Sequence, residues 1–104
     1  MKISIIVIVY NEVKTIKQAI DDVRSFEIDK EIIVIDNCST DGTVEVLKRL
    51  NYEDINIIYQ SKNYGVGKSY ETGFNIAKGN YIFVQHADLE YDYKVLLLLN
   101  GTAV

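Results

Sequence analysis

The sequence contains no proline, no tryptophan, one cysteine and one histidine. With Cys38 alone, no disulfide can form within the chain, and a structural thiol in a reducing compartment is the simplest interpretation. The single histidine, His86, follows a different predicted strand from the one that precedes Cys38. We therefore do not expect Cys38 to act as a nucleophile.

The sequence also lacks long hydrophobic runs and a basic patch. Its longest apolar runs, 5–10 and 95–99, are far shorter than the roughly 20 residues of a membrane-spanning helix. No signal-peptide pattern follows the apolar start. The formal net charge is −4 and the pI is about 4.9, which argues against a nucleic-acid partner. We expect a cytoplasmic protein with no transmembrane segment in this chain.

What the sequence does contain is typical of one globular domain: 104 residues, 48% hydrophobic and 25% charged. Continuous apolar runs predict buried strands at 3–9, 31–35 and 81–84, and 55–59 predicts a further strand nearer an edge of the sheet. Helical spacing predicts helices at about 13–26, 44–50, 65–78 and 93–100. This alternation predicts an α/β fold, a three-layer α/β/α domain with a mostly parallel open sheet.

Local signals refine these predictions. Asn11 is a suitable N-cap for the first helix, and Gly79 is a suitable stop for the third. The third helix should bury one apolar face, formed by Val66, Tyr70, Phe74 and Ala77.

The last predicted helix holds four consecutive leucines, 96–99, which cannot all face one side of a helix. We interpret the chain 1–104 as a single domain that is truncated, or that forms an oligomer through this helix. A frayed terminal helix is the alternative.

Polar residues follow all four predicted strands, where open parallel α/β sheets bind ligands. These are Tyr10 and Glu12, Asp36 and Asn37, Gln60 and Lys62, and His86 and Asp88. They predict a small-ligand crevice, although polar loops after buried strands are common.

The stretch 65–70, Gly-Val-Gly-Lys-Ser-Tyr, matches neither common phosphate loop. Tyr70 stands at the third glycine of the dinucleotide pattern, and Lys62 stands at the opening glycine of a Walker loop. What remains is a glycine-rich helix start with Lys68, which is either an anion site or a tight turn.

His86-x-Asp88 could hold a divalent ion, because Mg²⁺ prefers oxygen ligands and Mn²⁺ also tolerates nitrogen. A lone histidine is, however, more often a loop or core residue.

Four blocks together resemble a known family. They are Val-Tyr-Asn-Glu at 9–12, Ile-Asp-Asn-Cys-Ser-Thr-Asp-Gly-Thr at 35–43, Asn-Tyr-Gly-Val-Gly-Lys at 63–68 through Gly73, and 77–92, which contains His-Ala-Asp. In order and spacing the chain, from about 3 to 92, resembles the N-terminal, nucleotide-binding half of inverting family 2 glycosyltransferases with the GT-A fold. It is most similar to the dolichyl- and polyprenyl-phosphate sugar transferase branch.

The resemblance implies transfer of a sugar, with inversion, from a UDP- or GDP-sugar to a lipid phosphate or glycan. A lipid-phosphate acceptor would place the protein at the cytoplasmic membrane face. The implied nucleotide-sugar site comprises Ile8, Tyr10, Glu12, Ile35, Asp36, Asn37, Lys68, His86, Ala87 and Asp88. The implied cofactor is Mn²⁺ or Mg²⁺, held by Asp88 and His86.

Four positions depart from the family pattern. Ile8 and Tyr93 stand where prolines are common, Asn37 replaces a frequent aspartate, and His86 replaces the first aspartate of the Asp-x-Asp metal motif. No residue matches the family's general base, so we expect nucleotide binding without complete catalysis. A non-catalytic nucleotide-binding or regulatory module is one alternative. A structural or assembly protein that docks through the leucine-rich helix is another.

Overall fold

The computed structural model describes residues 2–88, 94–96, 98–99 and 102–103, with side-chain surroundings for 2–88. The elements are β1 (Ile3–Val9), α1 (Ile16–Arg24), β2 (Lys30–Asp36), α2 (Thr43–Leu50), β3 (Ile55–Tyr59), α3 (Val66–Ile76), β4 (Tyr81–His86), β5 (Lys94–Leu96), β6 (Leu98–Leu99) and β7 (Thr102–Ala103). No helix among these residues is long and apolar enough to cross a bilayer.

The main sheet has the strand order β3-β2-β1-β4-β5. The first four strands are parallel, and β5 runs antiparallel to β4. The mostly parallel α/β sheet is therefore confirmed. In the register, Val9 lies opposite Asp36 and Ile8 lies opposite His86. The carboxyl ends of β1, β2 and β4 consequently lie level with one another at one edge of the sheet.

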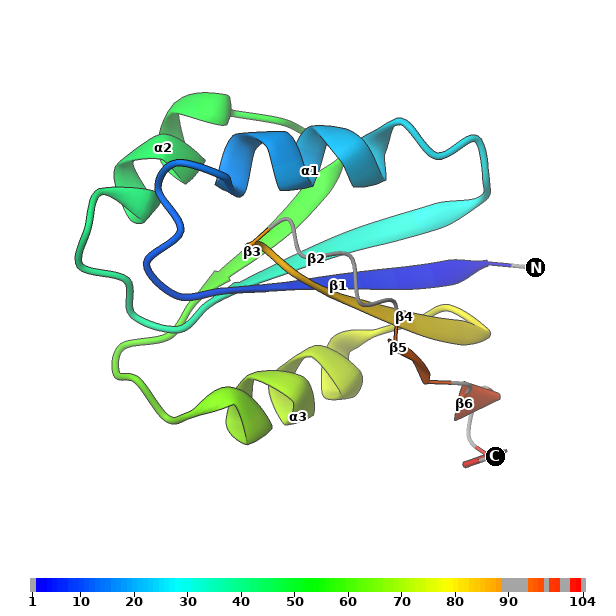
Figure 1. Cartoon of the computed structure of the whole chain (residues 1–104). Helices are drawn as coiled ribbons and strands as arrows, with labels where there is room; N and C mark the ends of the chain where they lie inside the picture. The colour runs from blue at the N-terminus through cyan, green and yellow to red at the C-terminus, as the bar shows by residue number, and fades with distance from the viewer. Residues whose placement is uncertain (1, 89–93, 97, 100–101, 104) are drawn as a thin grey trace.

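Helices cover both faces of the sheet, with α1 and α2 on one side and α3 on the other (Figure 1). The alternation of side chains along β1 explains the division: Val7 packs in the cluster with α1, whereas Ile6 and Ile8 pack in the cluster with α3. Both faces are apolar, as the unbroken hydrophobic run predicts. The three-layer arrangement is confirmed.

The predicted helix at 93–100 is wrong for the residues of this range that the structure describes, 94–96 and 98–99, and the others lie outside the described residues. Lys94–Leu96 forms β5, which pairs with β4 through Ile82–Leu96 and Val84–Lys94. Without β5, the outer edge of β4 would leave its backbone donors and acceptors without strand partners, and an extended Val-Leu segment can satisfy them. Docking or oligomerisation through a leucine-rich helix loses its basis, because residues 94–96 and 98–99 are strands.

Two predicted helix ends also differ. The N-cap residue of α1 is Thr15, not Asn11, which adopts a left-handed backbone with φ of 52°. Asparagine tolerates this conformation because its short polar side chain bonds locally. At the other end of the domain, α3 is capped by Ala77 rather than stopped by Gly79. Gly79 instead allows close backbone contact, since an added Cβ would lie 2.7 Å from the Ser4 nitrogen.

The sheet-facing side of α3 is only partly as predicted. Tyr70, Phe74 and Ala77 pack against the sheet, but Val66 is 49% exposed. The fully buried positions are small residues, Ser69 and Gly73. A Cβ at Gly73 would lie 2.8 Å from Ile6 Cδ1, so this glycine sets how closely the helix approaches β1.

Gly73→Ala should lower the free energy of unfolding by about 1–3 kcal/mol, because overpacking against Ile6 exceeds the helix-propensity gain of about 1 kcal/mol. Gly67→Ala is the matched control in the same helix, since nothing lies within 4 Å of its added Cβ. It should leave stability unchanged or raise it. Urea denaturation of the three proteins is the measurement. Equal stability of both variants would show that Gly73 does not set the helix–sheet distance.

Candidate functional site

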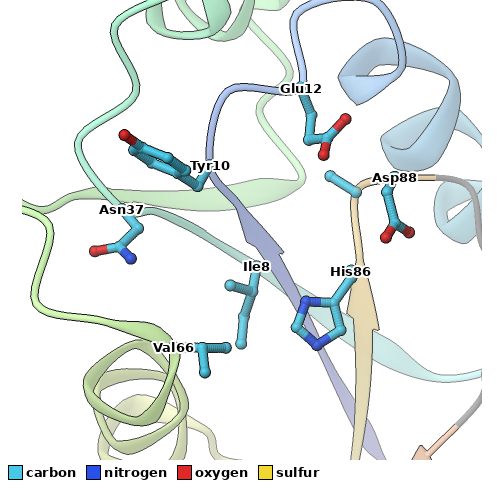
Figure 2. A pocket seen from close by; sticks show the side chains of 8 residues that line it. Ile8, Tyr10, Glu12, Asn37, Val66, His86 and Asp88 are labelled. Carbon is cyan, nitrogen blue, oxygen red and sulfur yellow. The ribbon is translucent and has the colours of Figure 1, made fainter.

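A pocket of about 150 Å³ lies at the carboxyl ends of β1, β2 and β4, beside the start of α3 (Figure 2). Its lining residues are Ile8, Tyr10, Glu12, Asn37, Val66, His86, Ala87 and Asp88. Glu12, Asn37 and Asp88 come from three separate segments of the chain, yet they border one crevice. The predicted convergence of strand ends is therefore confirmed for these three segments.

Seven of the ten residues expected in the site line this pocket, and Ile35, Asp36 and Lys68 do not. Ile35 is fully buried in the cluster with α3. Asp36 is also buried, and it accepts hydrogen bonds from the backbone nitrogen of Ser39 (3.1 Å) and from its hydroxyl (2.6 Å). Asp36 thus shapes the loop after β2.

Lys68 lies on the exposed side of α3, with its Nζ 3.5 Å from a carboxylate oxygen of Glu71. The end of β3 also contributes nothing to the pocket lining. Gln60 instead bonds to the hydroxyls of Ser69 (3.0 Å) and Thr72 (3.2 Å), which fastens β3 to α3. Gln60, predicted from a strand end, and Lys68, predicted from the glycine-rich helix start, therefore make contacts away from the pocket.

Two residues that border or support the site are absent from the sequence-based set. Val66 lines the pocket at the first position of α3. Tyr70, one turn further along, places its hydroxyl 2.8 Å from Nε2 of His86, and the two rings meet edge to face. The only sequence signal for either residue is its place on the glycine-entered helix.

The loop that carries Tyr10 and Glu12 is held by the loop that follows β2. Four hydrogen bonds, which we call the loop clasp, join them: Asn11 N to Ser39 Oγ (2.9 Å), Thr40 N to Asn11 Oδ1 (2.7 Å), Glu12 N to Thr43 Oγ1 (3.1 Å) and Val13 N to Asp41 Oδ2 (3.2 Å). The turn-rich stretch 36–43 therefore serves as a scaffold for the pocket as well as a cap for α2.

Asn37 joins β2 to the start of α3. Its Nδ2 donates to Asn63 Oδ1 (2.9 Å), and its Oδ1 accepts from the backbone nitrogen of Tyr64 (3.1 Å). Asn63 Oδ1 also accepts from the backbone nitrogen of Gly65 (2.9 Å). These bonds fix the turn before α3, and with it Val66, relative to the end of β2.

The acidic end of the pocket is formed by Glu12 and Asp88, with His86 nearby (Figure 2). Thr15 connects the two loops here, since its hydroxyl lies within hydrogen-bond distance of both the Ala87 carbonyl and Glu12 Oε2. Within residues 2–88, no cluster of three or more histidine, cysteine or acidic side chains could hold a metal ion. A hard ion could still bind, because Mg²⁺ commonly uses one or two carboxylates together with substrate phosphates.

In the loop clasp, Asp41 has a pKa below its usual value. Burial raises the pKa of this carboxyl, but hydrogen bonds from the Thr43 hydroxyl and from the backbone of Val13 and Thr43 outweigh it. The ionised form is therefore the one that the fold stabilises.

Comparison with known proteins defines the class. Residues 4–100 match the model of the glycosyl transferase family 2. The fold resembles a mannosyltransferase from Pyrobaculum calidifontis, solved with GDP-Man and Mn²⁺ (TM-score 0.76, 25% identity, 83% of this chain, 27% of that one). It also resembles S. aureus TarS 1-349, solved with UDP (TM-score 0.74, 27% identity, 85% of this chain, 28% of that one). The chain thus has the Rossmann-like, mostly parallel α/β sheet of the GT-A fold.

The chain belongs to glycosyl transferase family 2. Among its relatives it is 31% identical to a cholesterol galactosyltransferase of Borreliella burgdorferi, with 98% of this chain aligned. It is 30% identical to the undecaprenyl-phosphate 4-deoxy-4-formamido-L-arabinose transferase of Proteus mirabilis, again with 98% aligned. The chain spans 29% and 33% of the lengths of these relatives.

Asp41→Asn should make the stability of the domain less dependent on pH. Because the folded pKa of Asp41 is below its unfolded value of about 4, its contribution is present above that pH and is lost as the pH falls through the folded pKa. Urea denaturation between pH 7 and pH 3 should show a smaller loss of stability in the variant. Glu53→Gln, the same charge change at an exposed residue, is the control. Identical pH profiles for all three proteins would contradict this role of Asp41.

Proposed function

We propose that the residues that line this pocket bind the sugar donor, a nucleoside diphosphate sugar, of an inverting glycosyltransferase. The observation that carries the proposal is the convergence of Glu12, Asn37 and Asp88 on one pocket at the carboxyl edge of a parallel sheet. The structural neighbours that were solved with GDP-Man and with UDP support the same class of ligand.

The two ends of the pocket differ in chemistry, which suggests how a nucleotide would lie. Tyr10 and Asn37 lie on one side, away from Asp88 and His86 (Figure 2). Tyr10 is 44% exposed, so its ring can stack with a base, and aromatic–base stacking is worth about 1–3 kcal/mol. We assign the nucleoside to this side and the diphosphate to the side of His86 and Asp88.

At the diphosphate end, Asp88 and His86 would hold a divalent ion together with the phosphate oxygens. Such an ion, Mn²⁺ or Mg²⁺, would supply Lewis-acid neutralisation of the leaving diphosphate. Mn²⁺ suits this set better than Mg²⁺, because one of the two side-chain ligands is an imidazole. The hydroxyl of Tyr70 orients the ring of His86 through its Nε2 and leaves Nδ1 for the pocket.

For the acceptor we propose a lipid phosphate or a glycan. The first of these is supported by the undecaprenyl-phosphate sugar transferase of Proteus mirabilis among the relatives. A lipid-phosphate acceptor would bring the reaction to a membrane surface. Because the chain spans about a third of that relative's length, we assign donor binding alone to these 104 residues.

Nucleotide binding tests this proposal directly. UDP or GDP with Mn²⁺ should give measurable heat in isothermal titration and chemical-shift changes at residues of the pocket, at up to millimolar ligand. Asp88→Asn should weaken the Mn²⁺-dependent part of the affinity, because an amide is a poorer ligand for a hard cation than a carboxylate. Mn²⁺ without nucleotide is the control. No heat and no shift change at millimolar ligand would refute donor binding.

His86→Asp should raise Mn²⁺-dependent nucleotide affinity, on the order of tenfold, because a second carboxylate adds charge and an oxygen ligand. The substitution also removes the bond to Tyr70, so Tyr70→Phe is measured in parallel to isolate that loss. Titrations are compared with and without Mn²⁺. If the affinity of the His86→Asp protein does not respond to the metal, position 86 is not a metal position.

A further inference from the structure

The outer side of β3 carries backbone groups that no strand pairs with in the part of the chain that the structure describes. Gln60 donates its backbone N–H to the Asp36 carbonyl (2.9 Å), so the backbone of residue 60 faces β2. Along a parallel strand the facing direction alternates from one residue to the next. The N–H and C=O groups that point away from β2 therefore belong to Ile55, Ile57 and Tyr59.

The side chains of β3 are also incompletely covered. Ile57 and Ile58 pack against the two core clusters on opposite faces of the sheet, yet both are only partly buried. Tyr59, at the end of the strand, is 41% exposed. Helix α3 packs over β2 and β1, further toward the middle of the sheet. A strand added beside β3 would thus bury apolar surface as well as bond to the backbone.

The two edges of the main sheet differ in how they are protected. Proteins commonly block an edge strand by keeping it short or by placing a lysine or a proline in it. β5, at one edge, has three residues and includes Lys94. β3, at the other edge, has five residues, Ile-Asn-Ile-Ile-Tyr, without a charge or a proline. This contrast indicates that the edge at β3 is suited to pairing.

We infer that β3 is a homodimerisation strand, which pairs antiparallel with β3 of a second copy about a two-fold axis at Ile57. In this register Ile57 lies opposite Ile57 of the second copy, and Ile55 lies opposite Tyr59. All three outward-facing residues then exchange backbone hydrogen bonds with an outward-facing residue of the other copy. A two-fold axis makes each contact occur twice.

Charge favours a second copy in this antiparallel direction. Glu53 comes just before the strand and Lys62 comes shortly after it, and both side chains are exposed. An antiparallel partner brings Glu53 of one copy near Lys62 of the other, at both ends of the paired strands. A parallel partner would instead place like charges side by side.

The pairing leaves the pocket of each copy open. The pocket lies at the carboxyl ends of β1, β2 and β4, and antiparallel pairing points these ends in opposite directions in the two copies. The inference does not depend on nucleotide binding, so its failure would leave the proposed function untouched.

Sedimentation equilibrium from micromolar to millimolar protein tests the dimer. We expect a weak monomer–dimer equilibrium with a dissociation constant on the order of 0.1 mM, since a single edge strand makes a small interface. Tyr59→Pro should raise this constant by about tenfold or more, because proline removes an outward N–H and none that bonds to β2. Tyr59→Val is the matched control. It keeps the N–H and should change the constant by no more than about threefold.

A charge exchange tests the direction of pairing. Glu53→Lys and Lys62→Glu should each raise the dissociation constant by about three- to tenfold, because each places like charges together. The double variant restores opposite charges and should dimerise as the unchanged protein does. Circular dichroism checks that every variant is folded.

Hydrogen exchange of backbone amides, followed by NMR, tests the strand itself. The amides of Ile55, Ile57 and Tyr59 should exchange more slowly as the protein concentration rises, whereas those of Ile58 and Gln60, which face β2, should not change. A chain that stays monomeric at millimolar concentration would overturn the inference. So would a dimer that Tyr59→Pro and the charge variants leave unaffected, since another surface would then form it. Outward amides that are protected equally at every concentration would show that the edge is covered within one chain, which also contradicts it.

Discussion

The loop clasp is the constraint on which the site depends. A parallel sheet brings strand ends to one edge, but the loops beyond those ends are free to diverge. Here the loop after β2 supplies hydroxyl and carboxylate acceptors to three successive backbone nitrogens of the loop after β1, at Asn11, Glu12 and Val13. Hydrogen bonds to backbone nitrogens fix the path of the chain itself. Tyr10 and Glu12 are therefore positioned by residues that do not line the pocket.

Other residues of the pocket are also held by side chains from outside its lining. Tyr70 holds His86, and Thr15 connects Ala87 to Glu12. On the third side, Asn63 and the backbone nitrogen of Tyr64 hold Asn37. Each of these pocket residues thus has a partner on another segment, and preorganisation of this kind reduces the entropy lost on binding. Asp36 and Gln60 are polar residues at strand ends, but they bond to such supporting residues and do not line the pocket.

The sequence was most informative where one physical signal dominates. Stretches rich in β-branched residues predicted the bounds of β1 and β3 to the residue, and the parallel order followed from the alternation of strands and helices. The terminal segment was misassigned because leucine favours helix locally, whereas pairing with the edge of β4 is a tertiary effect. Within the site, Glu12, Asn37 and Asp88 could be placed from strand ends, but Tyr70 could not. Its contact with His86 depends on how closely α3 approaches the sheet, which Gly73 sets across the fold.

The close packing of α3 against the sheet limits how the pocket can adapt to ligands of different size. Gly73 lies against Ile6, and Ser69 is tied to Gln60, so the helix resists sliding or rolling on the sheet. The side of the pocket that this helix forms, at Val66, is therefore rigid. The solvent-exposed connection at 61–65 leads into the helix, and Asn63 and the backbone nitrogen of Tyr64 tie it to Asn37. Variation in length or composition of that short connection would therefore shift Asn37 and Val66, and so change the width of the pocket at this end, while the core of related chains stays the same.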